Sequence, residues 1–372
     1  MKILFFITED WFFCSHFIER AVAARDAGNE VVVLTHVGES ANAIREAGVR
    51  VIPLQIQRRS FNLLREALVI YAVWNAYKKE RPDLVHQVAL KPILYGTLAA
   101  RFSGIKAIVN APVGMGFVFS SRTFLARALR PIVQLALRSL LNPPGSKVVF
   151  ENSDDVEWAV SSNLVRRDSA ILIRGAGVDL VKFCPRAKAT DLPLVVLSAR
   201  MLWDKGIREF VEAAAIIKNR EIPARFILVG GVDTENPTSI PEAQLEQWAK
   251  DGVVEWWGHQ KDMAGVLGQA DIACLPSYRE GLPKSLIEAA ACGLPIVTTN
   301  VPGCREVVED GIQGLLVPVR DADALAEALA KLIADPALRA RMGAAARARA
   351  EAEFGLETII YQTLKLYREI AP

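Results

Sequence analysis

The sequence predicts an α/β protein made of two doubly wound, Rossmann-like domains that face each other across a cleft. Three observations lead to this prediction. Short apolar runs alternate with helical patterns along the chain, which is typical of parallel sheets covered on both faces. The 372 residues, 51% of them hydrophobic, are enough for two cores of ordinary size. Two prolines bracket charged and small residues between Lys182 and Pro193, and the alternation restarts beyond them.

The first half opens with an apolar run of strand length and a helical stretch that ends at Gly28. Apolar runs of strand length lie at 2–7, 30–35, 49–54, 83–88, 107–112 and 146–150. An Asn-Ser-Asp cluster at 152–154 follows the last run and predicts the cap of another helix. We expect residues 1–185 to form the first domain.

The second half repeats this alternation without a detectable sequence repeat. Its apolar runs lie at 194–200, 224–231, 253–259, 270–277 and 294–299, and helical segments follow at 322–336, 337–354 and 356–370. We expect residues 186–354 to form the second domain, with the C-terminal helix, about 355–372, able to pack back on the first. Doubly wound sheets bind ligands at the carboxyl ends of their strands, so an enzyme with a cleft is the leading class.

The net charge of +2 hides a basic region. Residues 52–147 carry 14 Lys and Arg against three acids, Glu66, Glu80 and Asp83, or +11. Cations interleaved with apolar residues, as in "RTFLARALRPIVQLALRSLL", favour contact with an anionic membrane surface over nucleic acid. A solvated basic helix is the simpler interpretation of the same pattern.

Compartment signals favour the cytoplasm. The five cysteines are odd in number and include no C-x-x-C pair, so they indicate neither a disulfide framework nor a zinc site. The opening "MKILFFITED" has too short an apolar stretch for a signal peptide, and no window reaches the roughly 18 apolar residues of a membrane span. We expect a cytoplasmic protein that is peripheral on the inner membrane.

The stretch "SYREGLPKSLIEAAACG" (277–293) places Glu280 and Glu288 around the start of a helix near Pro283. Free backbone N–H groups at such a start, from about Leu282 to Ser285, can hold a phosphate. Carboxylates accept hydrogen bonds from vicinal hydroxyls. Two carboxylates flanking a diphosphate match a nucleoside diphosphate sugar, although glutamates are also ordinary residues of helix starts.

Two cations follow the first strand of the second half. Arg200 lies at the carboxyl end of that strand and Lys205 just before Gly206, where both can neutralise a diphosphate. The first strand of the chain is followed by no G-x-G-x-x-G, and a G-x-x-x-x-G-K-[ST] loop is absent. The sequence therefore disfavours a dinucleotide-dependent dehydrogenase and a P-loop enzyme.

With these motifs the chain resembles the retaining glycosyltransferases of family 4, which have the GT-B fold. The resemblance covers nearly the whole chain and is strongest from "LSARMLWDKG" to "DADALAEAL". The E-x7-E motif of the family falls on Glu280 and Glu288, and its diphosphate-binding Arg and Lys fall on Arg200 and Lys205. "IRGAGVDLVKFCP" also resembles the family's segment ahead of the second domain.

The resemblance implies that a sugar moves from a nucleotide donor to an acceptor hydroxyl with retention at the anomeric carbon. It implies that Glu288 binds the ribose, Glu280 the donor sugar, and Arg200 and Lys205 the leaving diphosphate. The phosphates would also meet Gly281, Leu282, Lys284 and Ser285, with no cofactor beyond the donor. Asp321 and Asp323 form a "DAD" but read as helix-capping acids, so we expect no metal site.

The first domain departs from the family pattern. It lacks the glycine-rich loop after the first strand, and Asn110 stands where many relatives carry histidine. His16, expected at the start of a helix near Ser15, could face the reacting centre, although a lone histidine is more often structural. His86 reads as a packed strand-end residue.

The segments "VNAPVGMGFVFSS", "REGLPKSLIEAAACG" and "VPGCREVVEDG" resemble bacterial members that build lipid-linked surface glycans. This implies a hexose or N-acetylhexosamine, with UDP as the expected nucleotide, and a lipid-linked saccharide acceptor. A nucleotide-sugar epimerase of the same fold and a non-catalytic glycan-binding subunit are the alternatives.

Overall fold

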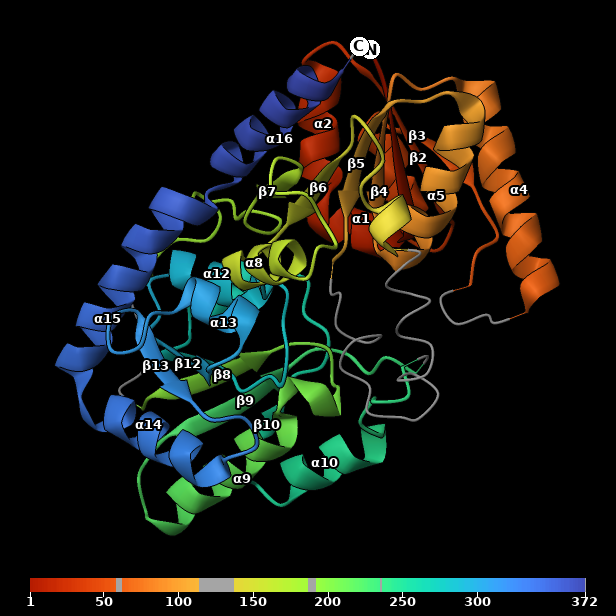
Figure 1. Cartoon of the computed structure of the whole chain (residues 1–372). Coiled ribbons are helices and arrows are strands. Elements are labelled where there is room, and N and C mark those ends of the chain that lie inside the picture. Colours follow the sequence, from red (N-terminus) through yellow and green to blue (C-terminus); the bar gives the residue numbers. More distant parts are fainter. Residues whose placement is uncertain (58–61, 114–136, 187–191, 235, 372) are drawn as a thin grey trace. The chain divides into compact units, whose positions relative to one another are not determined.

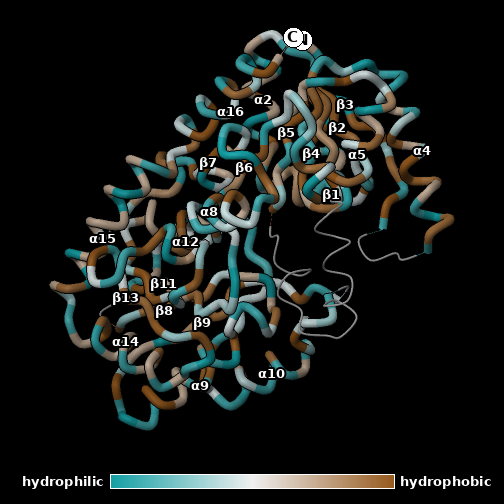
Figure 2. Tube along the Cα trace, in the orientation of Figure 1, coloured by the Kyte–Doolittle hydropathy of each residue, from teal (hydrophilic) through white to brown (hydrophobic). Residues whose placement is uncertain are grey.

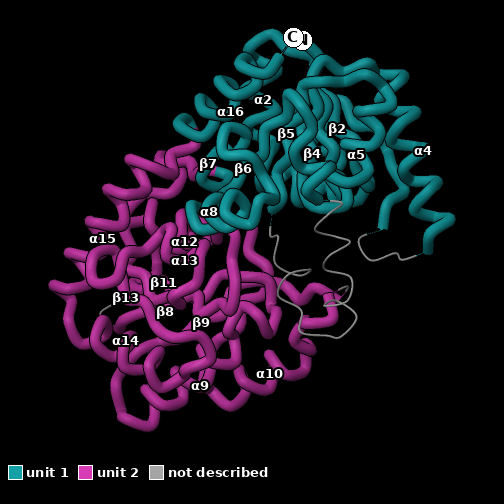
Figure 3. Tube along the Cα trace, viewed as in Figure 1, with its two compact units in different colours: residues 1–176, 357–372 teal, residues 177–356 magenta. Residues whose placement is uncertain are grey.

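The computed structural model describes residues 1–57, 62–113, 137–186, 192–234 and 236–371. The chain forms two compact units, each described by itself below (Figures 1 and 3). Unit 1 comprises residues 1–176 and 357–372, and unit 2 comprises residues 177–356.

Unit 1 is built on a parallel sheet of seven strands in the order β3-β2-β1-β4-β5-β6-β7. The strands are β1 (Lys2–Glu9), β2 (Glu30–His36), β3 (Arg50–Pro53), β4 (Leu84–Val88), β5 (Ala107–Ala111), β6 (Lys147–Phe150) and β7 (Ala170–Leu172). The helices are α1 (Asp10–His16), α2 (Ile18–Asp26), α3 (Ala41–Glu46), α4 (Leu63–Glu80), α5 (Leu90–Ser103), α8 (Ser153–Ser161) and α16 (Leu356–Ile370).

Unit 2 is built on a parallel sheet of six strands in the order β10-β9-β8-β11-β12-β13. Its strands are β8 (Leu194–Ser198), β9 (Arg225–Val229), β10 (Glu255–Trp256), β11 (Ile272–Leu275), β12 (Ile296–Thr299) and β13 (Gly314–Val317). Its helices are α9 (Ile207–Asn219), α10 (Glu242–Lys250), α11 (Met263–Leu267), α12 (Lys284–Ala291), α13 (Pro302–Val307), α14 (Ala322–Ala334) and α15 (Pro336–Arg349). These two sheets confirm the predicted pair of Rossmann-like domains.

Each sheet is buried on both faces, which explains why its strands read as unbroken apolar runs. In β1, Ile3 and Phe5 enter one core cluster while Leu4 and Phe6 enter the cluster on the opposite face. In β8 of unit 2, neighbouring valines at 195 and 196 divide between two clusters in the same way. Successive side chains of a strand point to opposite faces, so residues 3–7 of β1 and 194–197 of β8 are all buried.

The chain passes between the units at two places, near residue 176 and near residue 356. The N–H of Val178 donates to the carbonyl of Phe354 and the N–H of Leu356 to that of Val178, both at 2.9 Å. The first passage therefore lies ahead of the expected linker, because residues from Gly177 onward already bond within unit 2. Helix α16 places Ile359 and Leu366 in the core of unit 1.

Candidate functional site in unit 2

Two loops at the carboxyl edge of the unit 2 sheet are fixed against each other. The loop after β8 offers the carbonyl of Asp204, which accepts from the N–H of Tyr278 at 2.9 Å and from the hydroxyl of Ser277 at 3.0 Å. Gly206 has φ +72°, and a Cβ there would lie 2.0 Å from the carbonyl oxygen of Pro276. Only glycine permits this approach, so the turn after Lys205 packs directly on the loop that leads to Glu280.

Lys205 and Glu280 form an ion pair across these loops. The Nζ of Lys205 lies 2.6 Å from Oε1 of Glu280, and the two side chains are 21% and 10% exposed. A short, largely desolvated pair of this kind fixes both groups more firmly than a surface salt bridge would. The sequence placed these residues on one edge, and the structure brings them into direct contact.

Helix α12 begins one residue after Pro283, close to the predicted start. Pro283 is its N-cap rather than its first helical residue, and no side-chain hydrogen bond caps this end. A proline side chain has no hydrogen-bond acceptor, so Pro283 cannot cap the backbone N–H groups that give the helix start its partial positive charge. Gly281, Leu282, Lys284 and Ser285 surround this start, and Leu282 is anchored in the core of unit 2.

Glu288 lies on the fifth residue of α12 and is buried. Burial raises the pKa of its carboxyl group, and the positive charges of Lys284 and Lys182 act against this rise. The Nζ of Lys284 is 3.7 Å from Oε1 of Glu288, one helical turn away. Hydrogen bonds donated by ligand hydroxyls would stabilise the charged form of this buried carboxylate.

Arg200 has a partner that the sequence did not suggest. Its guanidinium lies 2.6 Å from Oδ2 of Asp233, which follows β9. Strands β8 and β9 are neighbours in the sheet, so their carboxyl ends bring the two residues together. The Arg200 side chain is 45% exposed and can therefore reach a ligand from this anchored position.

The expected position of His16 is wrong. Helix α1 starts at Asp10 directly after β1, and His16 is its last residue instead of standing at a helix start. Phe17, with φ −129°, separates α1 from α2. The imidazole of His16 stacks on Phe12 with ring centroids 4.2 Å apart.

Asn110 and His86 are core residues of unit 1. The Nδ2 of Asn110 donates to the carbonyl of Leu141 at 3.0 Å, and the side chain is fully buried. His86 is buried against Phe5, its Nδ1 is 2.6 Å from the Tyr367 hydroxyl, and desolvation lowers its pKa to about 3. The interpretation of His86 as a packed residue is confirmed. Asn110 is likewise buried, and its side chain holds the backbone at Leu141.

Other predicted features have separate outcomes. Asp321 caps α14 by accepting from the N–H of Ala324 at 2.8 Å, which confirms its capping role. Among the described residues, no group of three or more His, Cys, Asp or Glu side chains is arranged to hold a metal ion. Most of the basic segment 122–141, and also Gly114 and Gly116, lie outside the described residues, whereas Arg138 is described and exposed.

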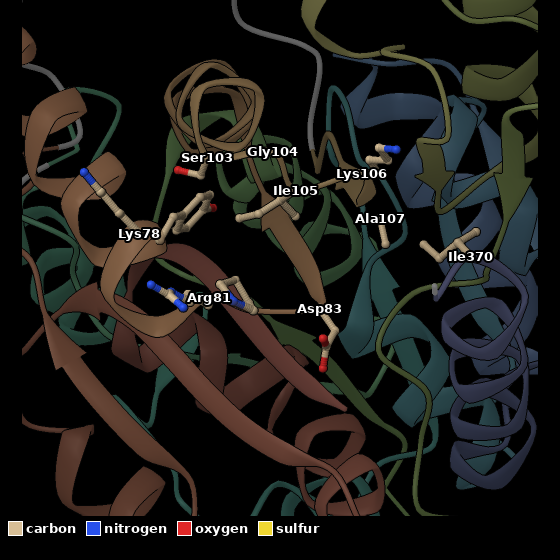
Figure 4. Close-up of a pocket in the computed structure, with 11 residues that line it drawn as sticks. Lys78, Arg81, Asp83, Ser103, Gly104, Ile105, Lys106, Ala107 and Ile370 are labelled. Atoms are coloured by element: carbon tan, nitrogen blue, oxygen red, sulfur yellow. The ribbon is translucent and has the colours of Figure 1, made fainter.

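A cavity of about 590 Å³ in unit 1 lies away from the ligand-binding end of its sheet (Figure 4). Asp83 and Lys106 line it directly ahead of β4 and β5, so it opens at the amino ends of these strands. Asp83 is engaged there by the N–H of Lys2 at 2.6 Å. Ligands of such sheets bind at the opposite end, so this cavity is a poor candidate for the substrate site.

Comparison with known families matches both halves of the chain. Residues 183–349 match the family described as glycosyl transferases group 1, and residues 2–141 match the family described as glycosyl transferase 4-like. The chain is 31% identical over 301 residues to an N,N'-diacetylbacillosaminyl-diphospho-undecaprenol alpha-1,3-N-acetylgalactosaminyltransferase of Campylobacter jejuni, which covers 77% of each protein. The chain belongs to glycosyltransferase family 4.

Further relatives of this family 4 glycosyltransferase are consistent with that assignment. A UDP-Gal:alpha-D-GlcNAc-diphosphoundecaprenol alpha-1,3-galactosyltransferase of Escherichia coli is 26% identical over 282 residues, 72% of this chain and 71% of that protein. The relatives are transferases, which does not favour an epimerase or a non-catalytic subunit.

Solved structures share the GT-B fold of this glycosyltransferase. Anabaena HepE in complex with UDP and glucose superposes with a TM-score of 0.78 at 20% identity, over 98% of each chain. A glycosyltransferase from Rickettsia africae gives 0.77 at 19% identity, over 99% of this chain and 98% of that chain. At these identities the likeness concerns the fold alone.

Proposed function

We propose that this glycosyltransferase moves a hexose or N-acetylhexosamine, with retention, from a UDP-sugar to a lipid-linked saccharide in bacterial surface-glycan synthesis. The observation that carries the proposal is the 2.6 Å Lys205–Glu280 pair beside the start of α12, where Pro283 makes no side-chain cap hydrogen bond. A cation, a carboxylate and a helix N-terminus thus lie at one edge of the sheet. The cation and the helix N-terminus can bind a diphosphate, and the carboxylate can bind sugar hydroxyls. The names of two relatives, which specify diphospho-undecaprenol acceptors, support the acceptor class.

In this proposal unit 2 holds the donor. Glu288 accepts hydrogen bonds from the ribose and Glu280 from the transferred sugar. Arg200 and Lys205 neutralise the diphosphate, helped by the backbone around Gly281 and Leu282 and by Lys284 and Ser285. Lys205 would then exchange part of its contact with Glu280 for a phosphate oxygen.

Because the sequence offers no obvious enzymic nucleophile, we propose that retention arises from front-face attack by the acceptor. The bond between the anomeric carbon and the diphosphate oxygen breaks, and the acceptor oxygen bonds to the same face of that carbon. The acceptor proton passes to the leaving phosphate, so the two cations would promote the step by stabilising the departing charge. Unit 1 supplies the acceptor side, with His16 as a candidate to face the reacting centre.

The test is a panel of UDP- and GDP-sugars, screened by thermal shift and hydrolysis and then with undecaprenyl diphosphate-linked saccharides. We expect a UDP-sugar to be consumed faster with acceptor than without it, because an epimerase would need no acceptor. Turnover should survive EDTA; a large loss restored by Mg²⁺ or Mn²⁺ would overturn the cation roles of Arg200 and Lys205.

Glu280→Gln tests the site itself. Loss of a positioned charge at the reacting sugar should lower kcat by at least about 100-fold while leaving the fold intact. Glu246→Gln, on the surface of α10 where its side chain is 53% exposed, is the matched control. Wild-type turnover in Glu280→Gln would sink the assigned role.

The acceptor class also implies contact with a membrane, and we infer that the chain is peripheral on the cytoplasmic face of the inner membrane. The charge of +11 over residues 52–147 supports attraction to anionic lipid. No helix in the described part of the chain is long and apolar enough to cross a bilayer. Charge reversal of Arg127, Arg130 and Arg138 should therefore weaken membrane fractionation.

A further inference from the structure

Helix α4 has two apolar faces, of which one is buried in unit 1. Val69, Val73 and Tyr77 recur every four residues and enter the core beneath the sheet. This face alone is enough to hold the helix on its unit. The second apolar face does not enter this core cluster.

The second face points to solvent over the first turns of α4. The side chains of Leu63, Leu64, Leu68 and Tyr71 are 84%, 81%, 68% and 59% exposed. Figure 2 shows hydrophobic residues recurring along this helix. Single exposed leucines are common on protein surfaces, but four large apolar side chains on one helix form a patch that calls for a partner.

Both carboxylates of α4 are turned away from this patch. Glu66 is held by Lys91 at 3.1 Å and by the Tyr95 hydroxyl, and its side chain is 13% exposed. Glu80 is held by Arg50 at 2.5 Å and by Lys2 at 3.3 Å, with its side chain 10% exposed. The carboxylates of the helix are thus neutralised by cations of the same unit.

The cations of α4 remain exposed. Arg65, Lys78 and Lys79 are all solvent-accessible, and the Nζ of Lys78 lies 5.1 Å above the ring of Trp74. Tyr71 packs beside Trp74 at 5.7 Å between ring centroids. Within the described residues, none of these three cations forms an ion pair, and Arg65 donates to Gln57 at 2.7 Å. Exposed leucines and aromatic rings beside such cations are the composition of an interfacial helix, whose aromatic rings lie at the lipid headgroups.

We propose that the outward face of α4, formed by Leu63, Leu64, Leu68 and Tyr71, inserts into the surface of an anionic lipid bilayer. This deepens the membrane contact of the proposed function, on which it rests for the location of the acceptor. The bilayer takes the leucines into its headgroup–acyl boundary while Arg65, Lys78 and Lys79 meet lipid phosphates. A helix of 18 residues lying flat would present about 27 Å of contact.

The experiment uses the full chain and flotation with vesicles of phosphatidylglycerol and phosphatidylcholine, compared with phosphatidylcholine alone. The double variant Leu64→Ser, Leu68→Ser should lower the partition coefficient by at least about tenfold. Arg65→Glu with Lys78→Glu should lower it by about fivefold for each cation removed and abolish the preference for anionic vesicles. Tyr361→Ser on α16, where the side chain is 62% exposed, is the control and should bind as the parent does.

A direct readout of insertion is the emission of a tryptophan placed at the patch by Leu64→Trp, which should shift to the blue with anionic vesicles. Unchanged flotation of the leucine double variant overturns the proposal. A change from dimer to monomer in that variant by light scattering would instead assign the face to a second copy of the chain. Turnover of a short-chain, water-soluble acceptor should be unaffected, so failure of docking is distinguishable from failure of the transferase assignment.

Discussion

Gly303→Ala should displace the loop that carries Glu280, the residue proposed to bind the transferred sugar. Gly303 is the second residue of α13 and packs on the backbone carbonyl groups of Glu280 and Gly281. A Cβ there would lie 2.3 Å from the Gly281 carbonyl oxygen and 2.9 Å from the carbonyl carbon of Glu280. Gly303 is not among the glycines with positive φ, so alanine can adopt its backbone and the whole effect comes from this contact.

The size of the displacement follows from these distances. Ordinary contact begins at 3.4 Å, so the oxygen must move by 3.4 minus 2.3, or about 1.1 Å. Misplacing a reacting group by about 1 Å costs on the order of 100-fold in rate. Overpacking of this kind also costs about 1–3 kcal/mol of stability.

The assay measures kcat/KM for the donor together with the Tm. We expect kcat/KM to fall about 100-fold while Tm falls by only a few degrees. The control is Gly311→Ala, where φ is +78° and a Cβ would meet no atom within 4 Å. It strains the backbone by about 1–2 kcal/mol but leaves Glu280 in place. If both variants kept parental kcat/KM, the position of the Glu280 loop would not matter for transfer.

Three further outcomes are expected. Tyr278→Phe removes the hydroxyl that donates to Oε1 of the buried Glu209 at 2.6 Å, so stability should fall by about 1–3 kcal/mol in chemical denaturation; an unchanged midpoint would contradict this. Tyr367→Phe leaves Nδ1 of His86 buried without its 2.6 Å partner, so the free energy of unfolding should fall by a similar amount and Tm should fall with it. Tyr361→Phe, on the exposed side of α16, should change neither. The folded-state pKa of His86, about 3, lies below its unfolded value near 6.5, so its contribution is fully present above pH 6.5 and is lost as pH falls from there toward 3. This contribution falls by about 1.4 kcal/mol per pH unit in that window, and His86→Gln should flatten that part of the stability profile measured by urea titration.

Sequence patterns were sufficient where the determinants are local. Residues 3–7 of β1 and 194–197 of β8 are all apolar because both faces of each strand are buried there. The start of α12 was predicted to within one residue because proline limits where a helix can begin. Asp321 was recognisable as a cap because it directly precedes an apolar helical period.

Contacts between loops that are distant in the sequence could not be predicted from local sequence patterns. Arg200 and Asp233 meet because β8 and β9 are neighbours, and a single sequence does not state strand order. The approach of Gly303 to Gly281 depends on the packing of α13 and leaves no trace except a glycine. His16 was misplaced because the chain turns from β1 into α1 without a glycine or a recognisable cap.

Unit 2 is an insertion in the sequence of unit 1, since α16 belongs to unit 1 but follows residue 356. During synthesis, all of unit 2 is therefore translated before α16 is complete. Until then the core of unit 1 lacks Ile359, Leu366 and Tyr367, while unit 2 can complete its own core as one continuous segment. The core of unit 1 can therefore be completed only after the whole of unit 2 has been translated.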